Sequence, residues 1–316
     1  MNKQITQWLW CSFYLISALE LWSGHGLNAG AFGKGLMMAL LPLLPGLALL
    51  VWLDRLPPIG AWGWAQAFGW GSLVIPFVAS FTHVMVRVVV EDKVSNSGLF
   101  GPGDDAALGS LAGSVLSAPM VEEALKGLLP FLLLWGRRPI LGPWRSVMVG
   151  SLVAFGFGWF ENAVHLGKAS AGSLMDAWNL RNSMAYLHVM FSLPMAFAIG
   201  LAALQSTLSR RIACIGLGWF LSALLHGLWN WEVLLGSTEF SVAPGFLSIK
   251  EWSLAIVPVA WLAIFWLDYR SLQGWGAPLA KWYARSGMRN QRSEIRRALR
   301  VRWAGKIHPK SSPQRA

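Results

Sequence analysis

The chain has 316 residues, of which 55% are hydrophobic and only 13% are charged, about half of the roughly 25% typical of soluble globular proteins. On a soluble domain its net charge of +11 would suggest nucleic acid as a partner. However, residues 281–316 hold eleven Lys and Arg and a single acid, Glu294, so this tail carries +10 of the charge. The body is nearly neutral and strongly apolar. This excludes a soluble nucleic-acid-binding protein and a disordered chain, and it predicts an all-α, polytopic helix bundle in the cell membrane.

Eight segments are long and apolar enough to cross the hydrocarbon core, which takes about 20 helical residues. In chain order they are 6–22, 35–53, 61–90, 106–135, 146–166, 181–204, 212–235 and 252–268. We expect the first to be a retained helix rather than a signal peptide, because only Lys3 precedes it and no small-residue cleavage site follows it. Cys11 and Cys214 both lie in apolar runs, so we expect neither a disulfide framework nor a cysteine metal site.

Basic residues between the predicted helices indicate how the bundle lies in the membrane. Arg137, Arg138 and Arg145 lie between the fourth and fifth segments, Arg210 and Arg211 lie between the sixth and seventh, and the basic tail follows the eighth. Lys and Arg are enriched on the cytoplasmic side of membrane proteins. Since alternation puts all three groups on one side, both termini are predicted to be cytoplasmic.

The basic tail has two interpretations. Ile295, Leu299 and Trp303 recur every four residues with arginines alongside, which is typical of an amphipathic helix lying on anionic lipid. A solvated basic tail that only sets the topology fits the same pattern equally well.

Ionisable side chains at membrane depth are the informative residues of so apolar a chain. Each costs roughly 2.5–3.5 kcal/mol at the bilayer centre, and such residues usually pair and mark function. Counted at about 1.5 Å per residue from the cytoplasmic arginines, Glu122, Glu161 and His226 lie at one height, roughly 22–24 Å, and His188 reaches that level from the outer end. We therefore predict a single site in the outer half of the membrane. Its candidate residues are Glu122, Glu123, Lys126, Glu161, Asn162, His188, His226 and Asn230.

Spacing predicts which side chains share a helix face. Glu122 and Glu123 precede Lys126 by four and three residues, so the lysine can hold one carboxylate ionised while the other faces a cavity. We expect stripes of small residues to draw the fifth and seventh segments together and to aim Glu161 and His226 inward, because such stripes let membrane helices approach closely. The stripes are Gly150, Ala154 and Gly158 on one segment and Gly218 and Ser222 on the other.

Each feature also has a purely structural interpretation. A Glu–Lys pair in a membrane helix is about as often a salt bridge that permits insertion as a catalytic pair. Asn162 and Asn230 can serve merely to join helices by hydrogen bonds. Two histidines and three glutamates at one depth on four helices favour a functional site.

Four motifs in this region resemble those of the PrsW family of intramembrane proteases, which is similar in turn to the CAAX-prenyl endopeptidases and bacteriocin-processing membrane proteases. The resemblance covers about residues 106–236. One turn after His188 the chain carries Ser192, where family members tend to carry threonine, and Pro194 follows soon after. The motifs read Glu122-Glu123-x-x-Lys126, Glu161-Asn162, His188 and His226-x-x-x-Asn230.

The resemblance implies hydrolysis of peptide bonds in membrane proteins, such as anti-sigma factors. A buried glutamate can deprotonate the attacking water and later protonate the leaving amine, and we expect Glu122 or Glu123 in this role. We expect His226 and Asn230 to stabilise the oxyanion.

Two histidines and a carboxylate are also a familiar catalytic zinc set. His188 and His226, with Glu161 or Glu122, could supply these ligands. The sequence contains no HExxH motif, and a glutamate-activated route without metal is the alternative.

Other functional classes stay open at this point. A proton-coupled transporter could relay protons through a Glu–His–Lys chain, and a membrane adaptor could act through its basic tail. The predicted organisation is an N-terminal three-helix region, a four-helix core, an eighth helix and a basic tail, and the sequence does not indicate an oligomeric state. These parts are 1–105, 106–236, 237–270 and 271–316.

Overall fold

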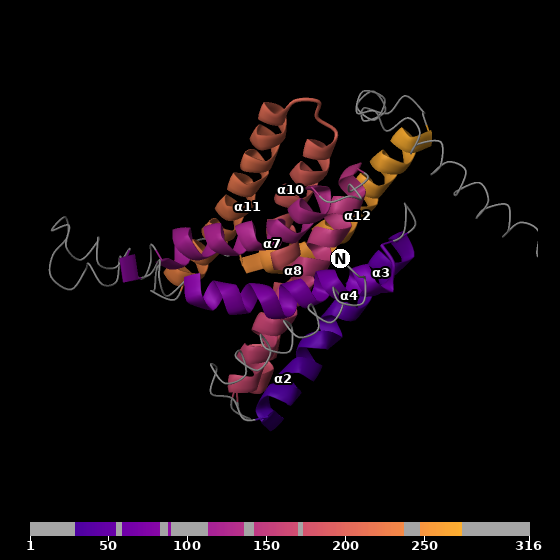
Figure 1. The fold of residues 1–316 in the computed structure, drawn as a ribbon. Helices are drawn as coiled ribbons and strands as arrows, with labels where there is room; N and C mark the ends of the chain where they lie inside the picture. The colour runs from indigo at the N-terminus through magenta and orange to yellow at the C-terminus, as the bar shows by residue number, and fades with distance from the viewer. Residues whose placement is uncertain are drawn as a thin grey trace, which may run out of the picture.

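The structure is a computed structural model, and it describes residues 29–54, 59–82, 88–89, 113–135, 142–169, 173–236 and 247–273. These residues are almost entirely helical and include no strand (Figure 1), which confirms the all-α class. The predicted first segment, 6–22, and the predicted amphipathic helix in the tail lie outside the described residues.

The described elements fall into three groups along the chain. The first is α2 (Ala29–Leu40), the short turn η1 (Leu41–Leu43), α3 (Leu44–Leu53), α4 (Ala61–Gly69) and the π-helical turn η2 (Trp70–Val74). The second is the π-helical turn η3 (Gly113–Ser117), α7 (Ala118–Trp135), α8 (Gly142–Lys168), α9 (Leu174–Arg181), α10 (Met184–Ala203) and α11 (Leu208–Gly236). The third is α12 (Leu247–Gln273).

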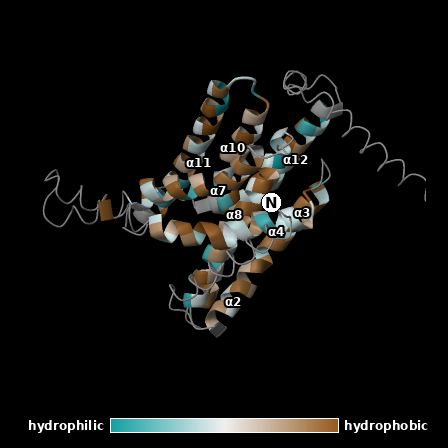
Figure 2. Ribbon diagram, in the orientation of Figure 1, coloured by the Kyte–Doolittle hydropathy of each residue, from teal (hydrophilic) through white to brown (hydrophobic). Residues whose placement is uncertain are grey.

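Five stretches of the described residues are long and apolar enough to cross a membrane, and they match the second and the fifth to eighth predicted segments. α7 is not among them because Glu122, Glu123 and Lys126 give its 18 residues three charged side chains. Apolar residues predominate on most helices (Figure 2). The count of eight spans and the cytoplasmic termini stay predictions. The five stretches are Gly30–Leu53, Gly142–Lys168, Leu174–Ala203, Leu208–Trp231 and Trp252–Arg270.

α8 is the central helix of the bundle and packs against α2, α4, α7, α10 and α12. In its most apolar stretch 89% of the residues are buried, as expected of a helix that is hydrophobic all round. Close approach depends on glycine: Gly35 of α2 and Gly71 of η2 lie directly against the carbonyls of Ala163 and Val153, where a Cβ would have no space.

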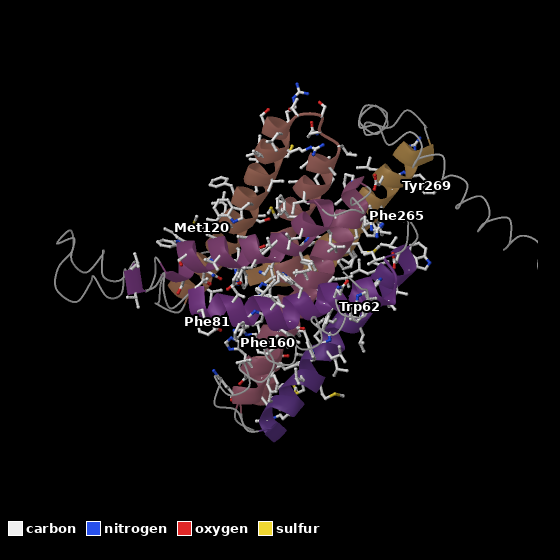
Figure 3. The ribbon with its side chains drawn as sticks, in the orientation of Figure 1. Trp62, Phe81, Met120, Phe160, Phe265 and Tyr269 are labelled. Atoms are coloured by element: carbon white, nitrogen blue, oxygen red, sulfur yellow. The ribbon has the colours of Figure 1, made fainter. Side chains whose placement is uncertain are left out.

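α12 is anchored at the N-terminal end of α8. Asp268 Oδ2 accepts a hydrogen bond of 3.2 Å from the backbone N–H of Trp144, which satisfies a donor that the first turn of a helix leaves unpaired. The Phe265 ring packs edge-on against Trp144 at 5.6 Å. It also stacks with Tyr269 at 6.1 Å, and Figure 3 labels both residues on α12.

The small-residue stripes pack differently from the expectation. A Cβ at Gly150 would meet Ala196, one at Gly158 would meet Ala185 and the ring of His188, and one at Gly218 would meet Ala198. Both stripes therefore pack on α10, and the expectation that they draw the fifth and seventh segments directly together was wrong. The physical reason is that small side chains allow any helix to approach, and here α10 fills the space between α8 and α11.

Candidate active site

A largely buried cluster joins α7, α8, α10 and α11. We use the name buried cluster for Glu122, Glu123, Lys126, Glu161, His188 and His226, of which Glu161 is the most exposed, with 31% of its side chain accessible. Glu123 is 0% exposed and Lys126 is 1% exposed. Charged side chains are almost never buried this far unless they are paired. Lys126 pairs with two carboxylates of the cluster, and Arg181, which lies outside it, pairs with the third.

Glu123 lies at the centre of the cluster. Its Oε1 accepts hydrogen bonds from Lys126 Nζ at 2.7 Å and from His226 Nδ1 at 2.9 Å. Its Oε2 accepts one from the Ser192 hydroxyl at 2.7 Å. Three donors from α7, α10 and α11 thus engage both oxygens, and this carboxylate ties the three helices together.

Lys126 connects Glu123 to the rest of the cluster. Its Nζ lies 3.6 Å from Glu122 Oε2 and 3.3 Å from His188 Nδ1. The ammonium also lies 4.4 Å from the centre of the Phe157 ring, a cation–π contact. One ammonium therefore pairs with two carboxylates of the cluster.

The two contacts of His188 determine which ring nitrogen carries the proton. An ammonium can only donate, so Nδ1 accepts from Lys126 and the proton of the neutral ring is on Nε2. Nε2 then donates to Glu161 Oε2 at 2.7 Å. Glu161 consequently fixes the orientation of this ring.

His226 uses its two ring nitrogens in the opposite way from His188. Its Nδ1 donates to Glu123, so in the neutral ring the lone pair is on Nε2. That nitrogen is 3.9 Å from Glu122 Oε2. The ring stacks on Phe191 at 4.9 Å with 15° between the planes, which further restricts its rotation.

Glu122, His188 and His226 form a candidate metal site. Each offers one ligand atom, and these atoms all lie within 4.8 Å of one another. Two imidazoles and a carboxylate are a familiar zinc set. Glu123 and Glu161 bind the second ring nitrogen of each histidine, as the outer carboxylates of zinc sites do. The residues present therefore fit zinc.

Glu161 and Asn162 connect the cluster to the chain before α10. Arg181 Nη1 donates to Glu161 Oε1 at 2.9 Å, and Asn162 Nδ2 donates to the Arg181 carbonyl at 3.0 Å. Glu161 is therefore the hydrogen-bond partner of His188. The carboxylate of the candidate metal site is that of Glu122.

Asn230 lies away from these contacts. Its Nδ2 donates to the carbonyl of Ser114 at 2.9 Å, a bond that joins α11 to η3. Its assignment as an oxyanion donor stays a prediction.

Sequence reasoning missed two contributors. Ser192 follows His188 by four residues on α10, and that spacing could have pointed to its contact with Glu123. Family members tend to carry threonine at this position, and the Ser192 hydroxyl supplies the same hydrogen-bond donor to Glu123. Arg181 is the second contributor, and nothing local in the sequence relates it to Glu161.

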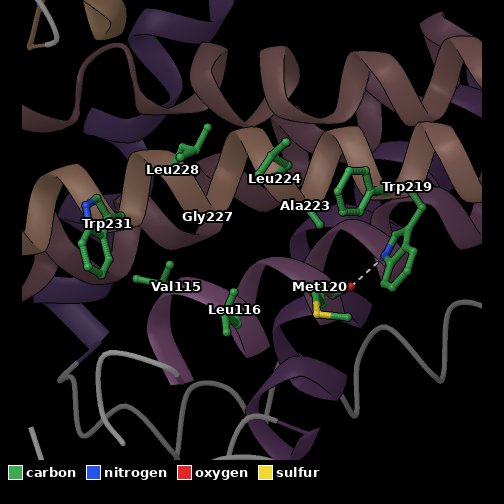
Figure 4. A pocket seen from close by; sticks show the side chains of 10 residues that line it. Val115, Leu116, Met120, Trp219, Ala223, Leu224, Gly227, Leu228 and Trp231 are labelled. Carbon is green, nitrogen blue, oxygen red and sulfur yellow. Dashed lines mark hydrogen bonds between the residues drawn. The ribbon is translucent and has the colours of Figure 1, made fainter. Parts of the chain in front are cut away.

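An apolar groove of about 460 Å³ lies between η3–α7 and α11, the helices that carry Glu122 and His226 (Figure 4). Trp219 Nε1 donates to the Met120 carbonyl at 3.0 Å and joins its two walls. The lining residues are Val115, Leu116, Met120, Trp219, Phe220, Ala223, Leu224, Gly227, Leu228 and Trp231.

A helical bundle with membrane-capable helices and a carboxylate–imidazole cluster is the arrangement expected of a membrane-embedded hydrolase. The family model of the PrsW family intramembrane metalloproteases matches residues 60–265, so the chain belongs to this family of intramembrane proteases. The match is wider than the motif region 106–236, since it includes α4 and most of α12. No curated protein and no solved structure matches the chain.

Proposed function

We propose that the chain cleaves membrane-anchored protein substrates and that Glu122, His188 and His226 form the reacting centre. The carrying observation is the convergence of one ligand atom from each residue within 4.8 Å, with a second carboxylate behind each histidine. A salt bridge that merely permitted insertion would not need two oriented imidazoles. Family membership favours this proposal over a proton-coupled transporter.

Zinc is the cofactor that this donor set supports. Glu122, His188 and His226 would hold the ion, and zinc bound there supplies a water that ionises near neutral pH and a Lewis acid for the carbonyl oxygen. We place Glu122 rather than Glu161 in the ligand set, because Glu161 already accepts the proton of His188 Nε2.

The remaining residues of the cluster hold these three in place. Glu123 orients His226, Glu161 orients His188, and Lys126 pairs with Glu122 and Glu123. In a route without metal, Glu122 is the group that takes the proton of the attacking water. Glu123 is less suited to this task, because it is fully buried and its oxygens accept from three donors.

The substrate class follows from the family and from the groove. We assign the apolar groove to an apolar segment of a membrane-anchored protein, a regulator such as an anti-sigma factor, because its walls belong to the helices of the reacting residues and are apolar throughout.

Reconstitution of the full chain with single-span test substrates in liposomes tests this function. We expect wild type and the exposed-site control Lys168→Gln to cleave, and Glu122→Gln and His226→Ala to lose about a hundredfold or more of the rate. Equal cleavage by all four proteins would overturn the proposal. Cleavage that survives complete removal of metal would assign the reaction to the Glu122 route.

A further inference from the structure

We propose that Lys126 competes with the metal ion for His188, so that the lysine contact and the zinc-bound site are alternative states of one centre. This inference rests on the proposed zinc site and adds a built-in competitor to it.

The neutral ring of His188 has one nitrogen lone pair to offer a metal ion. Nε2 carries the ring proton and donates to Glu161 at 2.7 Å, so Nδ1 is the nitrogen that can ligate an ion without breaking that bond. Nδ1 already accepts from Lys126 Nζ at 3.3 Å. An imidazole nitrogen has a single lone pair in the ring plane, so it serves either the ammonium or the metal.

The charges around Lys126 also favour competition between the lysine and the metal ion. Lys126 Nζ lies 3.6 Å from Glu122 Oε2 and 2.7 Å from Glu123 Oε1, so the ammonium pairs both with the carboxylate that would ligate zinc and with its neighbour. A divalent ion at the triad would repel an ammonium that contacts two of its three ligands. Binding of the ion therefore requires the Nζ contact with His188 to break.

The competitor has a function when no ion is bound. Glu123, which is 0% exposed, would be costly inside a membrane bundle without a cation beside it. Lys126 supplies that cation, and its ammonium lies 4.4 Å from the centre of the Phe157 ring. The lysine thus keeps the ion-free site folded and lowers the affinity of the folded site for zinc.

Zinc affinity of the detergent-solubilised full chain tests this inference. We expect Lys126→Met, which removes the ammonium but keeps an unbranched side chain, to bind zinc about ten- to a hundredfold tighter than wild type, the range over which residues around a metal site change affinity. Lys126→Arg keeps the charge and should stay near wild type. Lys168→Met, at an exposed position of α8, is the matched control and should not change.

A second measurement uses wild type alone and does not depend on the folding of a variant. In ¹⁵N NMR spectra of labelled histidine, zinc should shift the Nδ1 signal of His188 while Nε2 stays protonated. A shift at Nε2 with loss of its proton would overturn the inference, because the ion would then avoid the lone pair that Lys126 uses.

The outcomes separate this inference from the function on which it rests. If wild type binds zinc and needs it for cleavage, but Lys126→Met binds no tighter, the competition alone is wrong. If neither protein binds zinc and cleavage survives chelation, the zinc site itself is wrong, and the competition is overturned with it.

Discussion

His226 Nδ1 lies 2.9 Å from Glu123 Oε1, although the two residues are 103 positions apart in the chain. The same pairing recurs between His188 Nε2 and Glu161 Oε2 at 2.7 Å. Each histidine of the site is therefore held by its own carboxylate, and the two remaining ring nitrogens can act on a common centre. The consequences of these pairings can be measured.

The two adjacent glutamates should respond differently to neutralisation. Glu123→Gln leaves the ammonium of Lys126 buried without its closest counter-charge, and loss of one partner of a buried ion pair typically costs about 3–5 kcal/mol. The Glu122 side chain is 12% exposed. We therefore expect Glu122→Gln to lose less stability than Glu123→Gln and more activity. Thermal unfolding and cleavage measured side by side check this contrast. Equal stability losses would contradict it.

The hydroxyl of Ser192 should matter through Glu123. Ser192→Ala removes a hydrogen bond to a charged, fully buried carboxylate, and such bonds contribute about 1.5–3 kcal/mol. Ser192→Thr keeps the hydroxyl and should retain most of the stability and activity. Chemical denaturation and cleavage assays distinguish the two variants. A Thr variant as impaired as the Ala variant would show that packing, and not the donor, is decisive.

Arg181 should act on the reaction through Glu161 and His188. Removing its guanidinium in Arg181→Met releases one oxygen of Glu161 and weakens the orientation of the His188 ring. We expect a lower kcat with little change in KM and partial rescue by Arg181→Lys. A double-mutant cycle with Glu161→Gln should give a coupling of about 0.5–3 kcal/mol. Additive effects would mean that the two residues act independently.

Close packing of α8 on α10 should be sensitive to a single methyl group. In Gly158→Ala the new Cβ would lie 2.7 Å from Ala185 Cα and 3.1 Å from His188 Cδ2, and overpacking of this kind costs about 1–3 kcal/mol. Gly216→Ala is the matched control, because its Cβ would meet nothing within 4 Å. Thermal unfolding should separate the two, and equal shifts would refute the close contact.

Filling the apolar groove should weaken substrate binding. Leu224 lines the groove and is 43% exposed, so Leu224→Trp adds bulk without disturbing the buried cluster. We expect KM to rise while kcat stays near wild type, measured with a single-span substrate. Leu217→Trp changes an exposed leucine of α11 outside the groove and serves as the control. A change in kcat with no change in KM would show that the groove does not bind the substrate.

The sequence by itself determined the helical membrane class and the residue types of the site. Apolar composition and the cost of ionisable groups at membrane depth act along the chain, so they can be read without knowing any contact. Glu122, Glu123, Lys126, His188 and His226 were found in this way. Family membership then followed from the same motifs and extends from residue 60 to residue 265.

Tertiary structure alone decided how these side chains are used. The rotation of each helix about its axis places Glu161 on His188 and Glu123 on His226, and it turns Asn230 to the Ser114 carbonyl. Neither that rotation nor the insertion of α10 between the two glycine stripes is encoded in local spacing, because small residues permit close approach without specifying the partner. Which nitrogen of each imidazole has a lone pair to offer therefore depends on packing between helices distant in sequence.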